Sequence, residues 1–146
     1  MQTIMNSKKL ENSPIWYYIS ENKREDAVLF IHAAFSNHTQ YDKQIDEFSK
    51  YFKVITIDLI GHGKSTVTKK GDNITITSYW IKKILDKENI KKIHIVGISL
   101  GAVIAEDFAN HYPNMMKSLS CFGAYNINNF NLKMQKSNQI AQMIMI

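Results

Sequence analysis

Residues 92–101 read Lys-Ile-His-Ile-Val-Gly-Ile-Ser-Leu-Gly, and this stretch decides the fold. Its first half is a short, almost continuous apolar run, which is typical of a strand buried on both faces. Its second half is Gly-x-Ser-x-Gly, placed where the strand ends and a helix over residues 99–111 begins. The small glycines let the chain turn tightly and hold the serine hydroxyl above the sheet. The stretch therefore predicts a strand, a sharp turn carrying Ser99, and a helix.

The same alternation of strand and helix extends on both sides of this unit. Apolar or β-branched runs predict strands over residues 15–19, 27–32, 53–58, 92–97 and 118–122. Three- and four-residue spacing of apolar positions predicts helices over residues 39–52, capped by Thr39, over 77–87 and over 99–111. This order predicts an α/β fold, a mostly parallel sheet with helices on both faces.

Composition excludes several other classes of protein. The chain has 146 residues, 45% of them hydrophobic, with a net charge of +5 carried by 17 Lys and the single Arg24. The lysines are scattered or paired, without the arginine-rich stripe of nucleic-acid sites, so no nucleic-acid partner is expected. No apolar run reaches the roughly 18 residues of a membrane span, and residues 1–10 lack a signal-peptide core. The lone Cys121 excludes a disulfide framework and a cysteine-based zinc site, so we expect a cytoplasmic protein without a metal.

Two further loops are expected beside Ser99. His32-Ala33-Ala34-Phe35 follows one buried strand, and residues 58–65, Asp-Leu-Ile-Gly-His-Gly-Lys-Ser, follow the next. The carboxyl ends of parallel strands gather at one edge of a sheet, where ligands bind. All three segments should therefore border one crevice.

These motifs resemble the N-terminal half of an α/β-hydrolase, over residues 15–125. The resemblance rests on Asp-x-x-Gly-x-Gly-x-Ser at residues 58–65 and on the Gly-x-Ser-x-Gly elbow, in the family's order. It implies that Ser99 is a nucleophile and that the backbone N–H of Leu100 is one oxyanion donor. The second donor would be the N–H of Ala34, with Phe35 as the alternative. Ala33 stands where the family commonly has glycine, and its methyl group narrows the conformations that can aim the next N–H inward.

The five histidines all favour a structural interpretation over a catalytic one. His32 is expected to be a buried loop anchor and His62 a tolerant loop position. His38 precedes a helix, His94 sits inside a strand and His111 ends a helix.

The resemblance also implies an acid and a histidine after the serine, and neither occurs where the family places it. No Asp, Glu or His follows His111. We therefore expect residues 1–124 to form the N-terminal part of the core domain, truncated before its last strands, and residues 125–146 to begin a helical cap.

Two functions follow from this arrangement. The first is a serine hydrolase that cleaves a carboxylic ester or related acyl bond of a small molecule through an acyl-enzyme at Ser99, without a cofactor, present as an incomplete chain. The alternative is a truncated, catalytically impaired product that acts at most as a small-ligand-binding or interaction module. In either case the open sheet edge at residues 118–122 should favour self-association, and the substrate itself is not specified.

Overall fold

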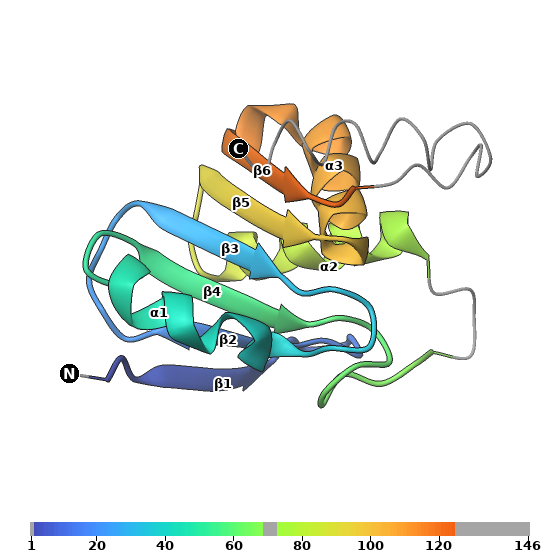
Figure 1. Cartoon of the computed structure of the whole chain (residues 1–146). Coiled ribbons are helices and arrows are strands. Elements are labelled where there is room, and N and C mark those ends of the chain that lie inside the picture. Colours follow the sequence, from blue (N-terminus) through green and yellow to red (C-terminus); the bar gives the residue numbers. More distant parts are fainter. Residues whose placement is uncertain (1, 69–72, 125–146) are drawn as a thin grey trace.

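The computed structural model describes residues 2–68 and 73–124, which form one sheet with helices on both faces (Figure 1). The strands are β1 (Met5–Lys9), β2 (Trp16–Ser20), β3 (Ala27–Ile31), β4 (Lys53–Asp58), β5 (Ile93–Ile98) and β6 (Met116–Phe122). The helices are η1 (His38–Tyr41), α1 (Asp42–Phe48), α2 (Ile74–Lys87), α3 (Leu100–His111) and η2 (Pro113–Met115). Within the described part, the strand order is β1-β2-β4-β3-β5-β6.

The sheet has a parallel portion and an antiparallel border. β3 pairs in parallel with both β4 and β5, and β5 pairs in parallel with β6. β2 is antiparallel to β4, and β1 is antiparallel to β2. The predicted α/β class and mostly parallel sheet are confirmed.

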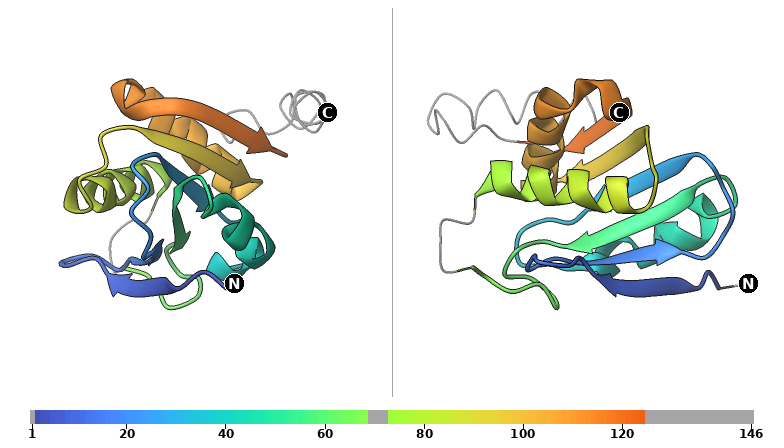
Figure 2. Two further views of the ribbon diagram at one scale, coloured as in Figure 1. Left: turned by 90° about the vertical axis from the view of Figure 1, so that its left-hand side faces the viewer. Right: turned by 180° about the vertical axis from the view of Figure 1, so that it is seen from behind.

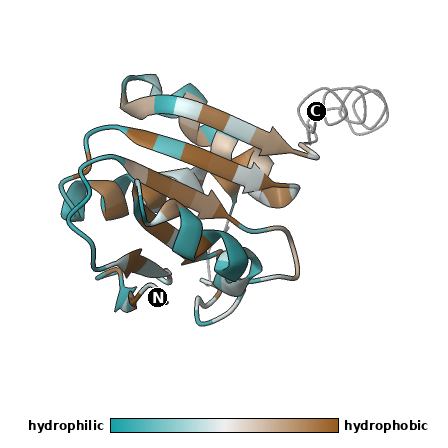
Figure 3. Cartoon of the chain, turned by 60° about the vertical axis from the view of Figure 1, so that its left-hand side comes forward, coloured by the Kyte–Doolittle hydropathy of each residue, from teal (hydrophilic) through white to brown (hydrophobic). Residues whose placement is uncertain are grey.

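The helices cover the two faces of the sheet to different extents. α1 lies on one face, while α2 and α3 lie side by side on the other (Figures 1 and 2). All five residues of the central strand β3 are buried, because helices cover it on both sides. The central strands are accordingly the most hydrophobic part of the ribbon in Figure 3.

β5 shows how the sequence assigns its side chains to the two faces. Ile93 and Ile95 are fully buried in the core beneath α2 and α3. The alternate residues Val96 and Ile98 are only partly buried and pack with α1 and β3 instead. This difference arises because α1 is a short helix that covers only part of its face.

Four elements differ from the sequence prediction by more than one residue. β1 was not predicted, because its sequence Met-Asn-Ser-Lys-Lys has no apolar alternation and the strand is held by backbone pairing to β2. The predicted helix over residues 39–52 is a 3₁₀ turn followed by the shorter α1, and its cap is Asn37, not Thr39, since the Asn37 side chain accepts the Thr39 N–H.

The other two differences are at the starts of elements. α2 begins at Ile74, earlier than predicted, because Asn73 caps it by accepting the Ile76 N–H at 2.7 Å. β6 begins at Met116 rather than at residue 118. The cap expected over residues 125–146 lies outside the described residues.

Candidate active site

Ser99 occupies a backbone conformation that L-residues rarely adopt. Its φ is 54° and its ψ is −115°, between the end of β5 and the first residue of α3. Such a conformation costs about 1–3 kcal/mol and persists only where the surroundings impose it. The Ser99 N–H donates to the carbonyl of Phe122 at 2.8 Å, and the Ser99 carbonyl accepts from Ala102 at 3.0 Å. The turn is therefore fastened to β6 on one side and to α3 on the other.

The two glycines that flank Ser99 are required by close backbone packing. A Cβ on Gly101 would lie 2.1 Å from the carbonyl oxygen of Ile31, and one on Gly97 would lie 2.4 Å from the carbonyl oxygen of Gly101. Real Cβ atoms do not approach backbone this closely. The Gly-x-Ser-x-Gly spacing thus lets the first turn of α3 press against β3 and β5.

The loop after β3 has most of its N–H groups already engaged. Ala33 donates to the side-chain oxygen of Gln40 at 2.9 Å, and Phe35 donates to Nε2 of His62 at 3.1 Å. Ala34 lies between them, and no acceptor among the described residues receives its N–H. Of the two donors that the sequence suggested, Ala34 is therefore the one whose N–H is available to a ligand.

Asp58, at the end of β4, accepts hydrogen bonds from β2, from η1 and from the loop that follows β4. Its carboxylate is fully buried and accepts from the Tyr18 hydroxyl at 2.7 Å, from the Lys64 N–H at 3.0 Å, and from both the N–H and Nδ1 of His38, at 2.9 and 2.8 Å. Burial raises the pKa of Asp58, but the N–H groups of Lys64 and His38 and the two side-chain donors outweigh it and lower the pKa below its usual value. Gly63 packs directly on this carboxylate, where a Cβ would lie 2.2 Å from it.

All five histidines have Nδ1 in a hydrogen bond. The partners of His32, His62 and His111 are backbone carbonyls, that of His38 is Asp58, and that of His94 is the Ser118 hydroxyl. Within residues 2–68 and 73–124, no histidine is hydrogen-bonded to the Ser99 hydroxyl. His32 is fully buried, as expected of an anchor, and burial holds its pKa below the usual range despite its bond to Ala33.

His62 is more than the tolerant loop position that we expected. Its Nδ1 lies 2.9 Å from the Ile60 carbonyl while its Nε2 receives the Phe35 N–H. It thereby joins residues 59–65 after β4, the Gly-rich loop, to the loop after β3. Neither this bond nor the set of bonds at Asp58 has a local signature in the sequence, although the Asp-x-x-Gly-x-Gly-x-Ser motif contains both residues.

A hollow of about 240 Å³ adjoins the residue after Ser99. It is mainly apolar and lies between the Gly-rich loop and the starts of α2 and α3. Its walls are Leu59, Ile60, His62, Val67, Asn73, Ile74, Thr77, Leu100 and Ile104. An uncharged substrate group of modest size would fit beside the candidate nucleophile.

Two other features, a cluster of metal-ligating side chains and a membrane-spanning helix, are not found among the described residues. In residues 2–68 and 73–124, no group of three or more His, Cys, Asp or Glu side chains is arranged to hold a metal ion. None of the helices described is long and apolar enough to cross a membrane.

Comparison with known families decides the identity of the fold. Residues 26–144 match the family model described as the alpha/beta hydrolase fold. The chain belongs to this family. The α/β-hydrolase resemblance, first drawn from the elbow and from residues 58–65, is confirmed.

Individual relatives cover most of this α/β-hydrolase chain. It is 26% identical over 117 residues to the (E)-2-((N-methylformamido)methylene)succinate hydrolase of Acinetobacter baylyi, an alignment covering 80% of this chain and 44% of that one. The crystal structure of the N-acyl homoserine lactonase AidH superposes with a TM-score of 0.74 at 28% identity, covering 84% of this chain and 46% of that one. The naproxen esterase of Bacillus subtilis gives a TM-score of 0.73 at 21% identity, covering 86% and 47%. The chain spans less than half the length of these relatives.

Proposed function

We propose that Ser99 is the nucleophile of a hydrolase that cleaves a carboxylic ester or a related acyl bond of a small molecule. The observation that carries the proposal is the Ser99 backbone, held at φ 54° in the turn between β5 and α3. A strained conformation that the surroundings over-determine is typical of functional positions. The hydrolase, lactonase and esterase among the similar proteins support the same reaction class.

The chemistry follows from the groups around the turn. The Ser99 Oγ attacks the acyl carbon and loses its proton to a base, while the carbonyl π bond opens to an oxyanion. The N–H groups of Leu100 and Ala34 stabilise that oxyanion, assisted by the partial positive charge at the start of α3. Collapse of the intermediate breaks the bond to the leaving group, which departs with a proton. Water then releases the acid from the acyl-serine and restores the hydroxyl.

The base is the part of this mechanism that the described residues do not supply. No histidine there is bonded to Ser99, and no Asp, Glu or His follows His111 in the sequence. We therefore propose that this chain carries the nucleophile and the oxyanion donors and reacts slowly by itself. An oxyanion hole alone retains some rate over water when the base is absent.

Labelling with a fluorophosphonate tests the proposal. The Ser99 Oγ would displace fluoride from phosphorus, and mass spectrometry would locate the adduct. We expect slow labelling at Ser99 that free imidazole accelerates, because imidazole can act as the missing base. Ser99→Ala should abolish the adduct.

Ser118→Ala is the matched control. Ser118 has a histidine nearby, with its Oγ 2.6 Å from Nδ1 of His94, but it lies in the regular strand β6 without an elbow. Labelling at Ser118 or elsewhere, with Ser99 unmodified even in the presence of imidazole, would overturn the assignment.

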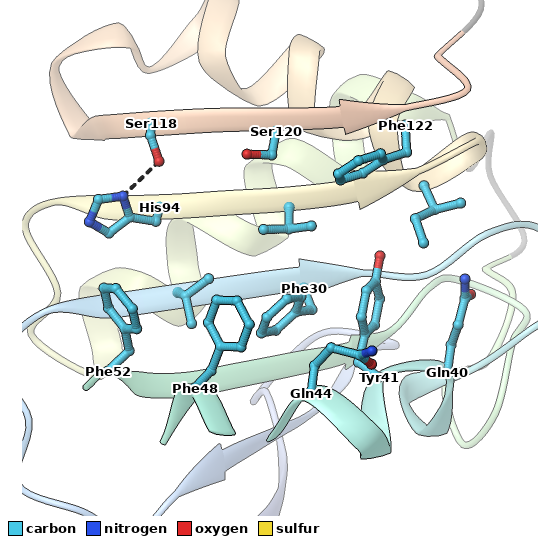
Figure 4. Close-up of a pocket in the computed structure, with 13 residues that line it drawn as sticks. Phe30, Gln40, Tyr41, Gln44, Phe48, Phe52, His94, Ser118, Ser120 and Phe122 are labelled. Carbon is cyan, nitrogen blue, oxygen red and sulfur yellow. Dashed lines mark hydrogen bonds between the residues drawn. The ribbon is translucent and has the colours of Figure 1, made fainter. Parts of the chain in front are cut away.

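A groove on the α1 face favours the alternative function, a binding or interaction module. It encloses about 560 Å³ between α1 and the side of β3, β5 and β6 that faces α1 (Figure 4). Phe30, Phe48, Phe52 and Phe122 line it, and the His94–Ser118 pair forms one polar end. Ser99 is not among its lining residues.

Binding of a neutral apolar fluorophore such as N-phenyl-1-naphthylamine separates the two functions. If the groove is a ligand site, binding should persist in Ser99→Ala and be lost in Val96→Lys, which places a charge within the groove. Equal binding by the wild type and Val96→Lys would exclude the groove as the site.

A further inference from the structure

The loop that carries Ala34 is held by hydrogen bonds, one of them to the imidazole of His62, and not by packing of the Phe35 side chain. Phe35, the next residue, has φ 62°, and its side chain is 100% exposed, so it makes no apolar contact that could fix the loop. Its N–H has one recorded acceptor, Nε2 of His62 at 3.1 Å. On this side of Ala34 the loop is therefore held by the bond to His62, while on the other side Ala33 is held through its N–H to Gln40 and through its carbonyl to Nδ1 of His32.

The hydrogen-bond partners of His62 show which of its two ring nitrogens carries the proton. The Ile60 carbonyl, 2.9 Å from Nδ1, can only accept, so Nδ1 carries the proton. The Phe35 N–H can only donate, so Nε2 must present a lone pair. Both bonds coexist only in the neutral ring with the proton on Nδ1.

A second histidine, His32 in the loop after β3, joins the same two loops by accepting an N–H from the Gly-rich loop. Its Nδ1 lies 2.7 Å from the Ala33 carbonyl, and its Nε2 accepts the Leu59 N–H at 3.0 Å, so it has the same tautomer. The rings of His32 and His62 lie 5.2 Å apart. His32 is fully buried whereas His62 is partly exposed, so His62 is the ring that solvent protons can reach.

The charged and titratable groups around these rings come from several elements. Beyond the effect of burial, Asp58 at the end of β4 raises the pKa of His32. His62 and His38, the latter from η1, lower it. Lys64 follows in the same loop, but its ammonium lies over the Trp16 ring, 5.0 Å from the centroid. The Asp58 carboxylate is already filled by four donors, so it offers no direct partner to a protonated His62.

We infer that His62 is a positioning residue that holds the Ala34 amide for the oxyanion only while its ring is neutral. A proton on Nε2 would replace the acceptor by a donor that faces the Phe35 N–H, and the bridge would open. The two loops would then be joined by the His32–Leu59 bond without the His62–Phe35 bond, and the Ala34 amide beside Phe35 would move away from the position of the oxyanion. This role rests on the proposed hydrolase function, while the bridge itself does not.

Nuclear magnetic resonance of the whole ¹⁵N-labelled chain tests the bridge directly. At about pH 8 the two-bond proton–nitrogen pattern of His62 should show the proton on Nδ1. As the pH is lowered and the His62 ring gains its second proton, the Phe35 amide should shift and exchange faster with solvent, in step with the His62 ring signals. A proton on Nε2 at pH 8 would overturn the inference. So would a Phe35 amide whose chemical shift and exchange rate stay constant while His62 is protonated.

Two variants separate positioning from general stability. His62→Gln supplies an amide oxygen near Nε2 that accepts at every pH, so the Phe35 amide should stay protected down to pH 5. His62→Ala should show the opened loop throughout. His94→Gln, a histidine on the other face of the sheet, should leave the Phe35 titration unchanged.

The rate of fluorophosphonate labelling connects the bridge to the reaction. Displacing one oxyanion donor should slow the Ser99 reaction by about tenfold or more. The wild-type rate should therefore fall relative to His62→Gln as the pH drops, and equal pH profiles would overturn the positioning role. If no reagent labels Ser99 at any pH, the proposed function fails, while the tautomer and amide measurements still decide whether the bridge exists.

Discussion

Gly101→Ala tests the close approach of α3 to the sheet, and two physical effects predict opposite signs for it. Gly101 lies in the first turn of α3, so helix propensity alone would make alanine stabilising by about 1 kcal/mol. The new Cβ, however, would lie 2.1 Å from the Ile31 carbonyl oxygen and 2.7 Å from that of His32. Both are backbone atoms of the central part of the sheet, so neither can rotate away.

The magnitude follows from the displacement that relieves this clash. α3 would have to withdraw from β3 by about 1 Å, which forfeits a quarter to a half of the dispersion energy along that contact. Overpacking of a core costs about 1–3 kcal/mol where side chains can adjust. Since backbone cannot, we expect a net loss of about 3 kcal/mol, which outweighs the propensity gain.

Urea denaturation followed by circular dichroism measures this difference. Gly123→Ala is the matched control, because a Cβ there meets nothing within 4 Å and only its φ of +64° opposes the substitution. We expect about 1 kcal/mol for the control. A Gly101→Ala protein as stable as the wild type, or a control that loses just as much, would refute the packing argument.

Three further substitutions, one of them with a matched control, address other parts of the molecule. Asp58→Asn should destabilise the fold by about 3 kcal/mol at pH 7, because four donors lose their charged acceptor. Since folding lowers the pKa of Asp58, its contribution is present above the ordinary carboxyl pKa and is lost as the pH falls through the lower folded value, so wild type and variant should converge in acid melts below about pH 4. Thr56→Val should be neutral or stabilising by up to about 1 kcal/mol in urea, because the buried Thr56 hydroxyl has no partner among the described residues, whereas Thr77→Val should lose about 1 kcal/mol with its bond to the Asn73 carbonyl. Leu119→Lys should reduce self-association in sedimentation velocity, because Leu119 is 40% exposed on the border strand β6.

Each of these expectations can fail separately. A pH-independent gap between wild type and Asp58→Asn would show that the carboxylate charge is not what the four donors recognise. Loss of stability in Thr56→Val equal to that in Thr77→Val would show that the Thr56 hydroxyl is satisfied in solution. A sharp wild-type monomer at high concentration would show that the edge at β6 does not drive association.

The sequence predicted the parallel strands and the elbow because local pattern is sufficient for both. β3 and β5 are short apolar runs, a pattern typical of buried strands, although only β3 is buried on both faces while β5 is partly exposed on its α1 side. The elbow was found because its spacing reflects backbone contacts within one strand–helix unit. The sequence pattern does not predict β1, because backbone pairing to β2, rather than an apolar face, holds this strand in the sheet.

The interactions that shape the site could not be read in the same way. The Phe35–His62 bond joins residues 27 positions apart, and the Tyr18–Asp58 bond joins residues 40 apart. A hydrogen bond between two loops imposes no periodicity on either sequence. The sequence therefore predicts a tolerant position for His62, whereas the fold places this ring opposite the Phe35 amide.

The place of β3 in the sheet has a consequence for the newly synthesised chain. β3 spans Ala27–Ile31, but its two neighbours, β4 and β5, end only at Asp58 and Ile98. At about 5–20 residues per second, a ribosome needs several seconds to make the interval between β3 and the end of β5. During that time the most apolar strand of the protein lacks at least one partner and is open to wrong pairing. We therefore expect the yield of native protein to depend on chaperones that shield residues 27–31 until β5 has emerged.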